Sequence, residues 1–234
     1  MKYFKIKTMK KIYIISILIL LIALQIRAQE ETGRSGILNA NEQSIGLATG
    51  IDYSILPLKL TYKRGFNIFN YKFPVNVGTD ITIPIFKFDL NDIRIRLITE
   101  TTIFRKKNFE IRGGIDPMFI NVKMETETMS SLGADFHIFT GFTNDKWNAG
   151  LDINYNQIFT TYVKHTDKFD EAVFEAQDGW YKLTAANIRL GVLVNRTLGN
   201  FDLYVNAGIS KTGKFNDYLF VPSMYGLIGV NYRF

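Results

Sequence analysis

Hydrophobic and polar residues alternate with a period of two from about residue 43 to residue 234, with almost no helical periodicity. In Trp147–Tyr155, the odd positions are Trp, Ala, Leu, Ile and Tyr, and the even positions are Asn, Gly, Asp and Asn. Successive side chains of a β-strand point to opposite faces, so this alternation predicts strands with one apolar and one polar face. Ten strands are expected, at residues 43–54, 56–65, 71–83, 93–104, 109–123, 130–142, 147–163, 183–195, 201–211 and 222–234.

The length of these strands favours a protein that crosses a membrane. They span roughly 10 to 17 residues, whereas strands of soluble domains average about 5–6 residues. A tilted strand needs about 9–11 residues to cross a bilayer. We therefore predict an all-β fold, a transmembrane antiparallel up-and-down β-barrel of about ten strands. A soluble lipocalin-like barrel would show the same alternation with its apolar face turned inward.

The connections between the strands help to separate these two folds. Short links are expected at residues 67–70, 105–108, 144–146 and 196–200, and they alternate with longer links at 84–92, 124–129, 164–182 and 212–221. Outer-membrane barrels have this asymmetry, with tight periplasmic turns and long external loops. Ten strands would place both ends of the barrel on the periplasmic side. The first external link, near Ile55, is the exception because it is too short for a typical external loop.

The aromatic residues of the apolar face gather beside the short turns. Amphipathic and large aromatic rings concentrate where hydrocarbon meets lipid headgroups, whereas a soluble core would scatter them along the strands. The opposite face is rich in Gly, Asn, Asp and Ser, as a narrow polar lumen requires. Both features favour the membrane barrel; the aromatic residues are Tyr62, Tyr71, Phe73, Phe109, Phe142, Trp147, Phe201, Tyr232 and Phe234.

The final segment, MYGLIGVNYRF at residues 224–234, resembles the last strand of Gram-negative outer-membrane β-barrel proteins. In that superfamily, a terminal Phe preceded by alternating apolar or aromatic residues forms the signal read by the barrel-assembly machinery. The resemblance implies that Tyr232 and Phe234 carry this signal and that outer-membrane lipid and lipopolysaccharide surround the barrel. It leaves the function open, because small barrels of this superfamily include pores, enzymes, adhesins and secretion accessories.

The N-terminal segment has the three parts of a secretory signal peptide. Residues 1–11 are basic, Ile12–Leu24 is an apolar run, and the small Ala28 precedes Gln29. The apolar run is too short to cross a bilayer as a helix, which takes about 20 residues. We expect a cleaved signal peptide at 1–28, a short periplasmic lead-in at 29–42 and the barrel at 43–234, in a protein exported to the outer membrane.

The amino-acid composition argues against several other functions. The formal charge of +6 suggests nucleic-acid binding, but residues 1–28 contain six of the 28 bases and no acid. The remaining 22 bases equal the 22 acids, so we expect no nucleic-acid partner. The chain has no cysteine, which excludes disulfides, Cys-ligated zinc, a thiol nucleophile and a lipoprotein anchor.

The polar face predicts a charge-balanced lumen. A selective pore would show an excess of one sign, whereas balanced charges in a poorly solvated interior pair with one another. We expect an internal network of ion pairs and hydrogen bonds; a narrow polar pathway with weak selectivity is the alternative. The eight bases are Lys59, Lys63, Lys72, Arg94, Arg96, Arg112, Arg189 and Arg233, and the eight acids are Asp52, Asp80, Glu100, Glu110, Asp116, Asp135, Asp152 and Asp202.

Candidates for catalysis are few. Asp135 and His137 lie two apart on one predicted strand and could form an acid–imidazole pair in the lumen. No serine accompanies them in the local pattern, so we expect His137 to be a hydrogen-bonded lumen histidine without a catalytic role. His165-Thr166-Asp167 begins the longest loop and would serve a hydrolase at the outer rim. We expect no catalytic residue, cofactor or metal site, and keep an outer-rim hydrolase using His165 or His137 as an alternative.

The external loops are the better place for a partner. In residues 164–182, Phe169, Val173, Ala176 and Trp180 recur at helical spacing, which predicts a short amphipathic helix that caps the barrel or contacts a partner. Residues 212–221 form an unusually apolar loop. A second alternative function is therefore an accessory subunit of an envelope transport or secretion complex, which would dock through both loops; the second loop contributes Phe215, Tyr218 and Phe220.

Overall fold

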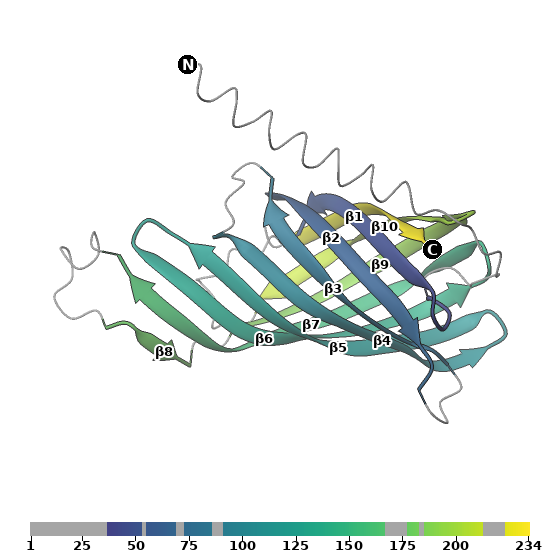
Figure 1. The fold of residues 1–234 in the computed structure, drawn as a ribbon, viewed down its shortest axis with the longest axis horizontal. Helices are drawn as coiled ribbons and strands as arrows, with labels where there is room; N and C mark the ends of the chain where they lie inside the picture. The colour runs from purple at the N-terminus through teal and green to yellow at the C-terminus, as the bar shows by residue number, and fades with distance from the viewer. Residues whose placement is uncertain are drawn as a thin grey trace, which may run out of the picture. The chain divides into compact units, whose positions relative to one another are not determined.

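A computed structural model describes residues 37–52, 55–68, 73–85, 91–166, 177–182, 185–212 and 223–234. This part of the chain forms strands joined by turns and loops (Figure 1). The strands are β1 (Gln43–Ile51), β2 (Ile55–Phe66), β3 (Val75–Pro84), β4 (Ile93–Lys106), β5 (Phe109–Lys123), β6 (Glu127–Thr143), β7 (Trp147–His165), β8 (Gly179–Tyr181), β9 (Ala185–Leu198), β10 (Phe201–Thr212) and β11 (Met224–Arg233).

Ten of these strands close into an antiparallel barrel, which confirms the predicted strand number and topology. Each strand of the ring pairs with its neighbours in the order β1 to β7, β9, β10, β11. Pairing of β1 with β11, from Ser44↔Arg233 to Ile51↔Gly226, closes the ring. Closure removes the unpaired edges that an open sheet would expose. Within the described residues, no helix is long and apolar enough to span a membrane.

The eleventh strand, β8, lies outside the ring and corrects the prediction for Trp180. Strand β7 pairs with β9 over Trp147–Ile158 and with β8 further along, at Thr161–Val163. Trp180 therefore lies in a short strand and not in the amphipathic helix expected from its spacing. Its ring packs edge-on against Tyr162, at 5.4 Å between ring centroids. The other predicted loop contacts, Phe169, Val173, Phe215, Tyr218 and Phe220, lie outside the described residues, as do Lys72, the predicted signal peptide and residues 29–36.

The links at one end of the barrel are short, and we call this the turn end. They comprise residues 107–108, 144–146 and 199–200. Lys107 and Gly199 have positive φ angles of 53° and 60°, as the first residue of a tight hairpin turn requires. At the opposite end, which we call the loop end, the link between β5 and β6 is only 124–126. It was expected to be longer, but β6 begins at Glu127, where Met124 N donates to the Glu127 carbonyl.

Two β-bulges change which side chains face inward. In β4, the register shifts between Thr102 and Phe104, so Ile103 and Phe104 are both exposed on the outer surface. The shift turns Arg105, expected in a link, toward the interior. A second bulge pairs Leu132 with Thr160 and Gly133 with Ile158, leaving Phe159 exposed between them. One extra residue reverses the alternation of a strand, so a strict period of two does not predict the residues beyond a bulge.

Burial in this barrel is the reverse of that in a water-soluble domain. Outward-facing apolar side chains are exposed, with Leu97 at 55% and Ile103 at 58%. Inward-facing charged side chains are buried, and Asp80 is 0% exposed. The apolar core cluster of the described residues is small, with Met118 and Ile158 packed against Ile120. Charged side chains are almost never fully buried unless they are paired, so partners for these groups must exist inside the barrel.

Candidate functional site

The candidate site is a cavity of about 200 Å³ inside the barrel. Alternation along the strands brings polar side chains to its wall from every ring strand except β3. Asp80, Glu110 and Arg233, also expected inside, are buried but do not line the cavity. Thirteen other ionisable residues that the sequence predicted for the interior line the cavity. They are Asp52, Lys59, Lys63, Arg94, Arg96, Glu100, Arg112, Asp116, Asp135, His137, Asp152, Arg189 and Asp202.

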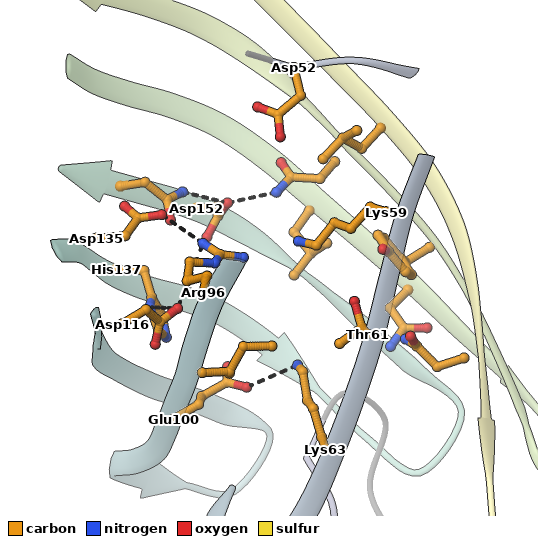
Figure 2. Close-up of a pocket in the computed structure, with 18 of the residues that line it drawn as sticks. Asp52, Lys59, Thr61, Lys63, Arg96, Glu100, Asp116, Asp135, His137 and Asp152 are labelled. Carbon is orange, nitrogen blue, oxygen red and sulfur yellow. Dashed lines mark hydrogen bonds and ion pairs between the residues drawn. The ribbon is translucent and has the colours of Figure 1, made fainter. Parts of the chain in front are cut away.

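Arg96 joins three strands at the centre of the site (Figure 2). Its Nε and Nη2 donate to Asp80 Oδ2 on β3, at 2.8 and 2.6 Å, and its Nη1 donates to Asp135 Oδ2 on β6, at 2.6 Å. Asp116 on β5 lies 3.6 Å from Nη1. Lys59 Nζ lies 3.3 Å from Asp80, so this carboxylate has two cationic partners. One guanidinium therefore holds three carboxylates in a region with little access to water.

Asp52 bridges the interior from one wall to another. It follows β1, and its carboxylate accepts a hydrogen bond from Arg94 Nη2 at 3.1 Å and pairs with Arg189 Nη1. Arg94 lies on β4 and Arg189 on β9, three strands from β1 in opposite directions around the ring. The Arg189 guanidinium also lies over the Tyr225 ring, 5.1 Å from its centroid. These contacts cross the interior and narrow it.

A third cluster lies closer to the turn end. Glu100 contacts Lys63 at 3.6 Å and Arg112 at 3.3 Å. The Arg112 guanidinium lies 4.2 Å from the centroid of the buried Phe139 ring. Phe139 was not predicted to face inward, although it shares the parity of Asp135 and His137 on β6. Its side chain, not a polar one, fills this part of the barrel.

Arg105 and Glu110 form a separate pair on β4 and β5. Arg105 Nη2 donates to Glu110 Oε1 at 3.0 Å, and Thr102 Oγ1 donates to the same oxygen at 2.7 Å. Glu110 is fully buried. The bulge near Thr102 makes this pair possible, and for that reason the sequence pattern identified Glu110 but not its partner.

The last strand is tied to its neighbour by a two-point ion pair. Arg233 donates from Nε to Asp202 Oδ2 and from Nη2 to Oδ1, each at 2.6 Å. Planar two-point contacts of this kind are among the stronger charge-assisted hydrogen bonds. The Tyr232 ring packs against Phe201 with centroids 5.0 Å apart. The role of Tyr232 and Phe234 as an assembly signal stays a prediction.

The segment before β1 folds back onto the turn end. Asn41 N donates to the Gly65 carbonyl at 2.8 Å, and Gly65 N donates to the Glu42 carbonyl at 2.9 Å. The backbones are so close that a Cβ on Gly65 would lie 2.0 Å from the Asn39 carbonyl oxygen. This turn directs the buried Leu38 into the wall of the cavity. Residues 37–42 are therefore packed against the barrel, where the sequence predicted only a polar lead-in.

His137 contacts a different carboxylate from the one beside it in the sequence pattern. His137 Nδ1 lies 3.4 Å from Asp116 on β5, whereas Asp135 is held by Arg96. The Asp135–His137 pair, which the sequence offered as an alternative, is not formed, because an arginine two strands away holds that carboxylate. In the part of the chain that the structure describes, no hydroxyl group is a hydrogen-bond partner of the His137 ring. Asp116 also accepts a hydrogen bond from Thr99 N at 2.7 Å, which fixes its orientation.

His165 contacts Asp178 at the loop end. Its backbone N donates to Asp178 Oδ1 at 2.7 Å, and Nδ1 lies 3.1 Å from the same oxygen. Hydrogen bonding from the His165 backbone N–H lowers the pKa of Asp178, with a smaller contribution from the imidazole. The contact joins the end of β7 to the residue before β8. Asp167, which the sequence placed beside His165, lies outside the described residues.

This contact predicts a pH dependence of the β8 attachment. A lowered pKa means that the contribution of the carboxylate is complete above the ordinary Asp pKa of about 3.9 and is lost as pH falls through the lower folded value. The His165 amide proton should therefore keep its downfield NMR position to below pH ~3.9. In Asp178→Asn this transition should be absent. A wild-type transition at or above the ordinary Asp pKa would contradict the assignment.

Other polar residues of the site were not singled out from sequence. Tyr204, Asn206 and Tyr225 all line the cavity, and Tyr225 Oη donates to Asn206 Oδ1 at 3.3 Å. Asn206 and Tyr204 share the parity of Asp202 on β10, so the period of two could have identified them. Tyr225 shares the parity of Arg233 but looks apolar in a strand rich in hydrophobic residues. Its neighbour Gly191 offers no side chain, and a Cβ there would lie 2.1 Å from the Tyr225 hydroxyl.

The described residues contain no group of three or more His, Cys, Asp or Glu side chains that could hold a metal ion. A comparison of the chain with protein-family models matches no family. A search of curated proteins finds no match either.

Proposed function

We propose that the chain is an outer-membrane β-barrel protein with a non-enzymatic role, structural or porin-like, whose narrow and charge-balanced interior is closed to all but the smallest polar solutes. The observation that carries this proposal is the reversed burial of the barrel. Outward-facing Leu97, Ile103 and Val192 are exposed, while Asp80 and Glu110 have no exposed surface. Lipid would cover the exposed apolar side chains. The barrel can lie in lipid because closure pairs its backbone N–H and C=O groups between strands.

The aromatic residues give independent support for a membrane location. Phe109, Phe142, Trp147 and Phe201 are exposed and lie at the ends of β5, β6, β7 and β10, beside the short turns. Rings at one level of the barrel would match the aromatic girdle at a lipid–water interface. In this orientation, the turn end faces the periplasm and the loop end faces outward.

The interior supports a closed barrel more than an open pore. Asp52 links opposite walls, Arg96 holds three carboxylates and Leu38 enters the cavity from the turn end. Single-channel recording of the refolded chain from Gln29 onward, in a planar bilayer, tests this proposal. We expect brief, low-conductance events or none. Large, stable openings from a barrel shown to be folded would contradict a closed interior.

Releasing the segment before β1 should open the turn end. Gly65→Val places a side chain against the Asn39 carbonyl, which lies 2.0 Å from the Cβ position. Residues 37–42 can then no longer pack against β2, and we expect the single-channel conductance to rise several-fold. Gly179→Val is the matched control, since no atom lies within 4 Å of its Cβ position. Equal conductance in both variants and the wild type would show that the segment does not obstruct the interior.

A second candidate function, an accessory of an envelope complex, is favoured by one observation at the loop end. Trp180 on β8 is 62% exposed, and Tyr181 beside it is also exposed. A strand that lies outside the ring and carries two exposed rings offers a docking surface. Trp180→Ala should then remove an envelope protein that co-purifies with the barrel in mild detergent, while leaving the folded barrel intact. An unchanged set of co-purifying proteins would count against this function.

A further inference from the structure

Among the described residues, one interior carboxylate differs from the others in having no ion-pair partner. Seven of the eight acidic side chains predicted for the interior have a basic partner within 4.0 Å, and these include Asp52, Asp80, Glu100 and Asp135. Asp152 on β7 has no basic partner among the described residues, although it is only 9% exposed. Burying an uncompensated charge is costly, so such a group recruits a counter-charge or takes up a proton.

The surroundings of Asp152 hold it in a fixed position. Its Oδ2 accepts hydrogen bonds from Asn154 Nδ2 at 2.8 Å and from Asn206 Nδ2 at 2.7 Å (Figure 2). Asn206 lies on β10 and reaches Asp152 across β9, where Gly191 stands opposite Asp152. Gly191 has no side chain, and a Cβ there would lie 2.1 Å from the Tyr225 hydroxyl, which donates to Asn206. Both donors are uncharged amide groups, so neither supplies a counter-charge to the carboxylate.

We infer that Asp152 binds a monovalent cation, an alkali ion or a primary ammonium group, inside the cavity. Oδ1 of Asp152 has no hydrogen-bond partner among the described residues, and the residue lines the cavity together with Asn154 and Asn206. One carboxylate oxygen and neighbouring amide and phenol oxygens supply hard ligands for an alkali ion, or acceptors for the three N–H bonds of an ammonium group. A single negative charge suits a monovalent ion, since Ca²⁺ sites use several carboxylates.

Side-chain amide NMR of the barrel refolded in detergent tests this inference directly. The amide groups of Asn154 and Asn206 donate to Asp152, so their ¹H–¹⁵N signals report on its charge. We expect saturable shifts with sodium chloride, methylammonium chloride or both, and none with choline chloride, which has no N–H and is too large for close approach. Saturation with sodium chloride would identify an inorganic ion as the ligand, and saturation with methylammonium chloride would identify an ammonium group. Linear changes common to all three salts would overturn the inference.

Two variants sharpen the result. Asp152→Asn should abolish the saturable shift, whereas Asp145→Asn, the same change at an exposed position of the β6–β7 turn, should retain it. If the Asp152→Asn variant fails to fold, the ¹³Cγ signal of Asp152 in the wild-type protein tests the inference instead. A carboxylate signal at pH 7 that shifts with cation supports the site, and a protonated carboxyl signal overturns it. These readouts use folded protein in detergent and need no conduction, so a negative result leaves the proposed membrane function standing.

Discussion

Arg96→Met is expected to lower the free energy of unfolding of the barrel by about 3–5 kcal/mol, the range for breaking a buried ion pair on one side. Arg96 donates to Asp80 and Asp135 and lies beside Asp116, so its loss removes the guanidinium shared by carboxylates on β3, β5 and β6. Lys59 remains as a partner for Asp80 alone. Urea unfolding in lipid vesicles, followed by the gel mobility of folded and unfolded forms, measures the change.

The control for this prediction is an Arg→Met substitution on the outer surface of the barrel. Arg196 is exposed, and its guanidinium lies 5.1 Å from the centroid of the Trp147 ring. Arg196→Met should cost no more than about 1 kcal/mol, as for other exposed cation–π contacts. If the two variants were equally stable, the interior network would contribute little to holding the barrel closed.

Val192→Arg is expected to cost about 2–4 kcal/mol, the range for a charged residue at the midplane on the lipid face of a barrel. Val192 is exposed and lies in the middle of β9, where it pairs with Leu151 and Ala207. Leu198→Arg introduces the same charge beside the 199–200 turn. There the cost should fall to about 0–1 kcal/mol, because the side chain can reach the interface.

This pair of variants separates a membrane barrel from a soluble one. Both wild-type side chains are exposed to a similar extent. In water, replacing either by arginine would be close to neutral, as for most surface substitutions. Urea titration of both variants in vesicles measures the difference, and equal small effects at the two positions would contradict the proposed lipid contact.

The barrel itself could be predicted from sequence because a period of two is a local property. Each strand carries its own alternation, as in Trp147–Tyr155, and the closing pair of β1 and β11 follows from an even number of antiparallel strands. The interior position of Asp52, Arg94 and Arg189 follows from the same parity. The pairing of both arginines with the Asp52 carboxylate does not follow from parity, because it brings together strands that are far apart in the ring.

The errors have local physical causes. Arg105 was assigned to a link because the bulge at Thr102 leaves no mark in the hydrophobic pattern. The pairing of His137 with Asp116 depends on which carboxylate Arg96 takes. Trp180 matched a helical spacing, yet backbone pairing with β7 made it part of a strand. In each case, an interaction between strands overrode the pattern within one segment.

The membrane location is tested most directly by the fluorescence of Trp147. The chain has two tryptophans, so Trp180→Phe leaves Trp147 as the only one. Its exposed ring lies on the apolar face beside the 144–146 turn. In vesicles of brominated lipids, we expect strong quenching, greatest when the bromines lie near the headgroup end of the acyl chain. A barrel that folds in plain buffer and whose Trp147 emission is unaffected by brominated lipid would contradict the account.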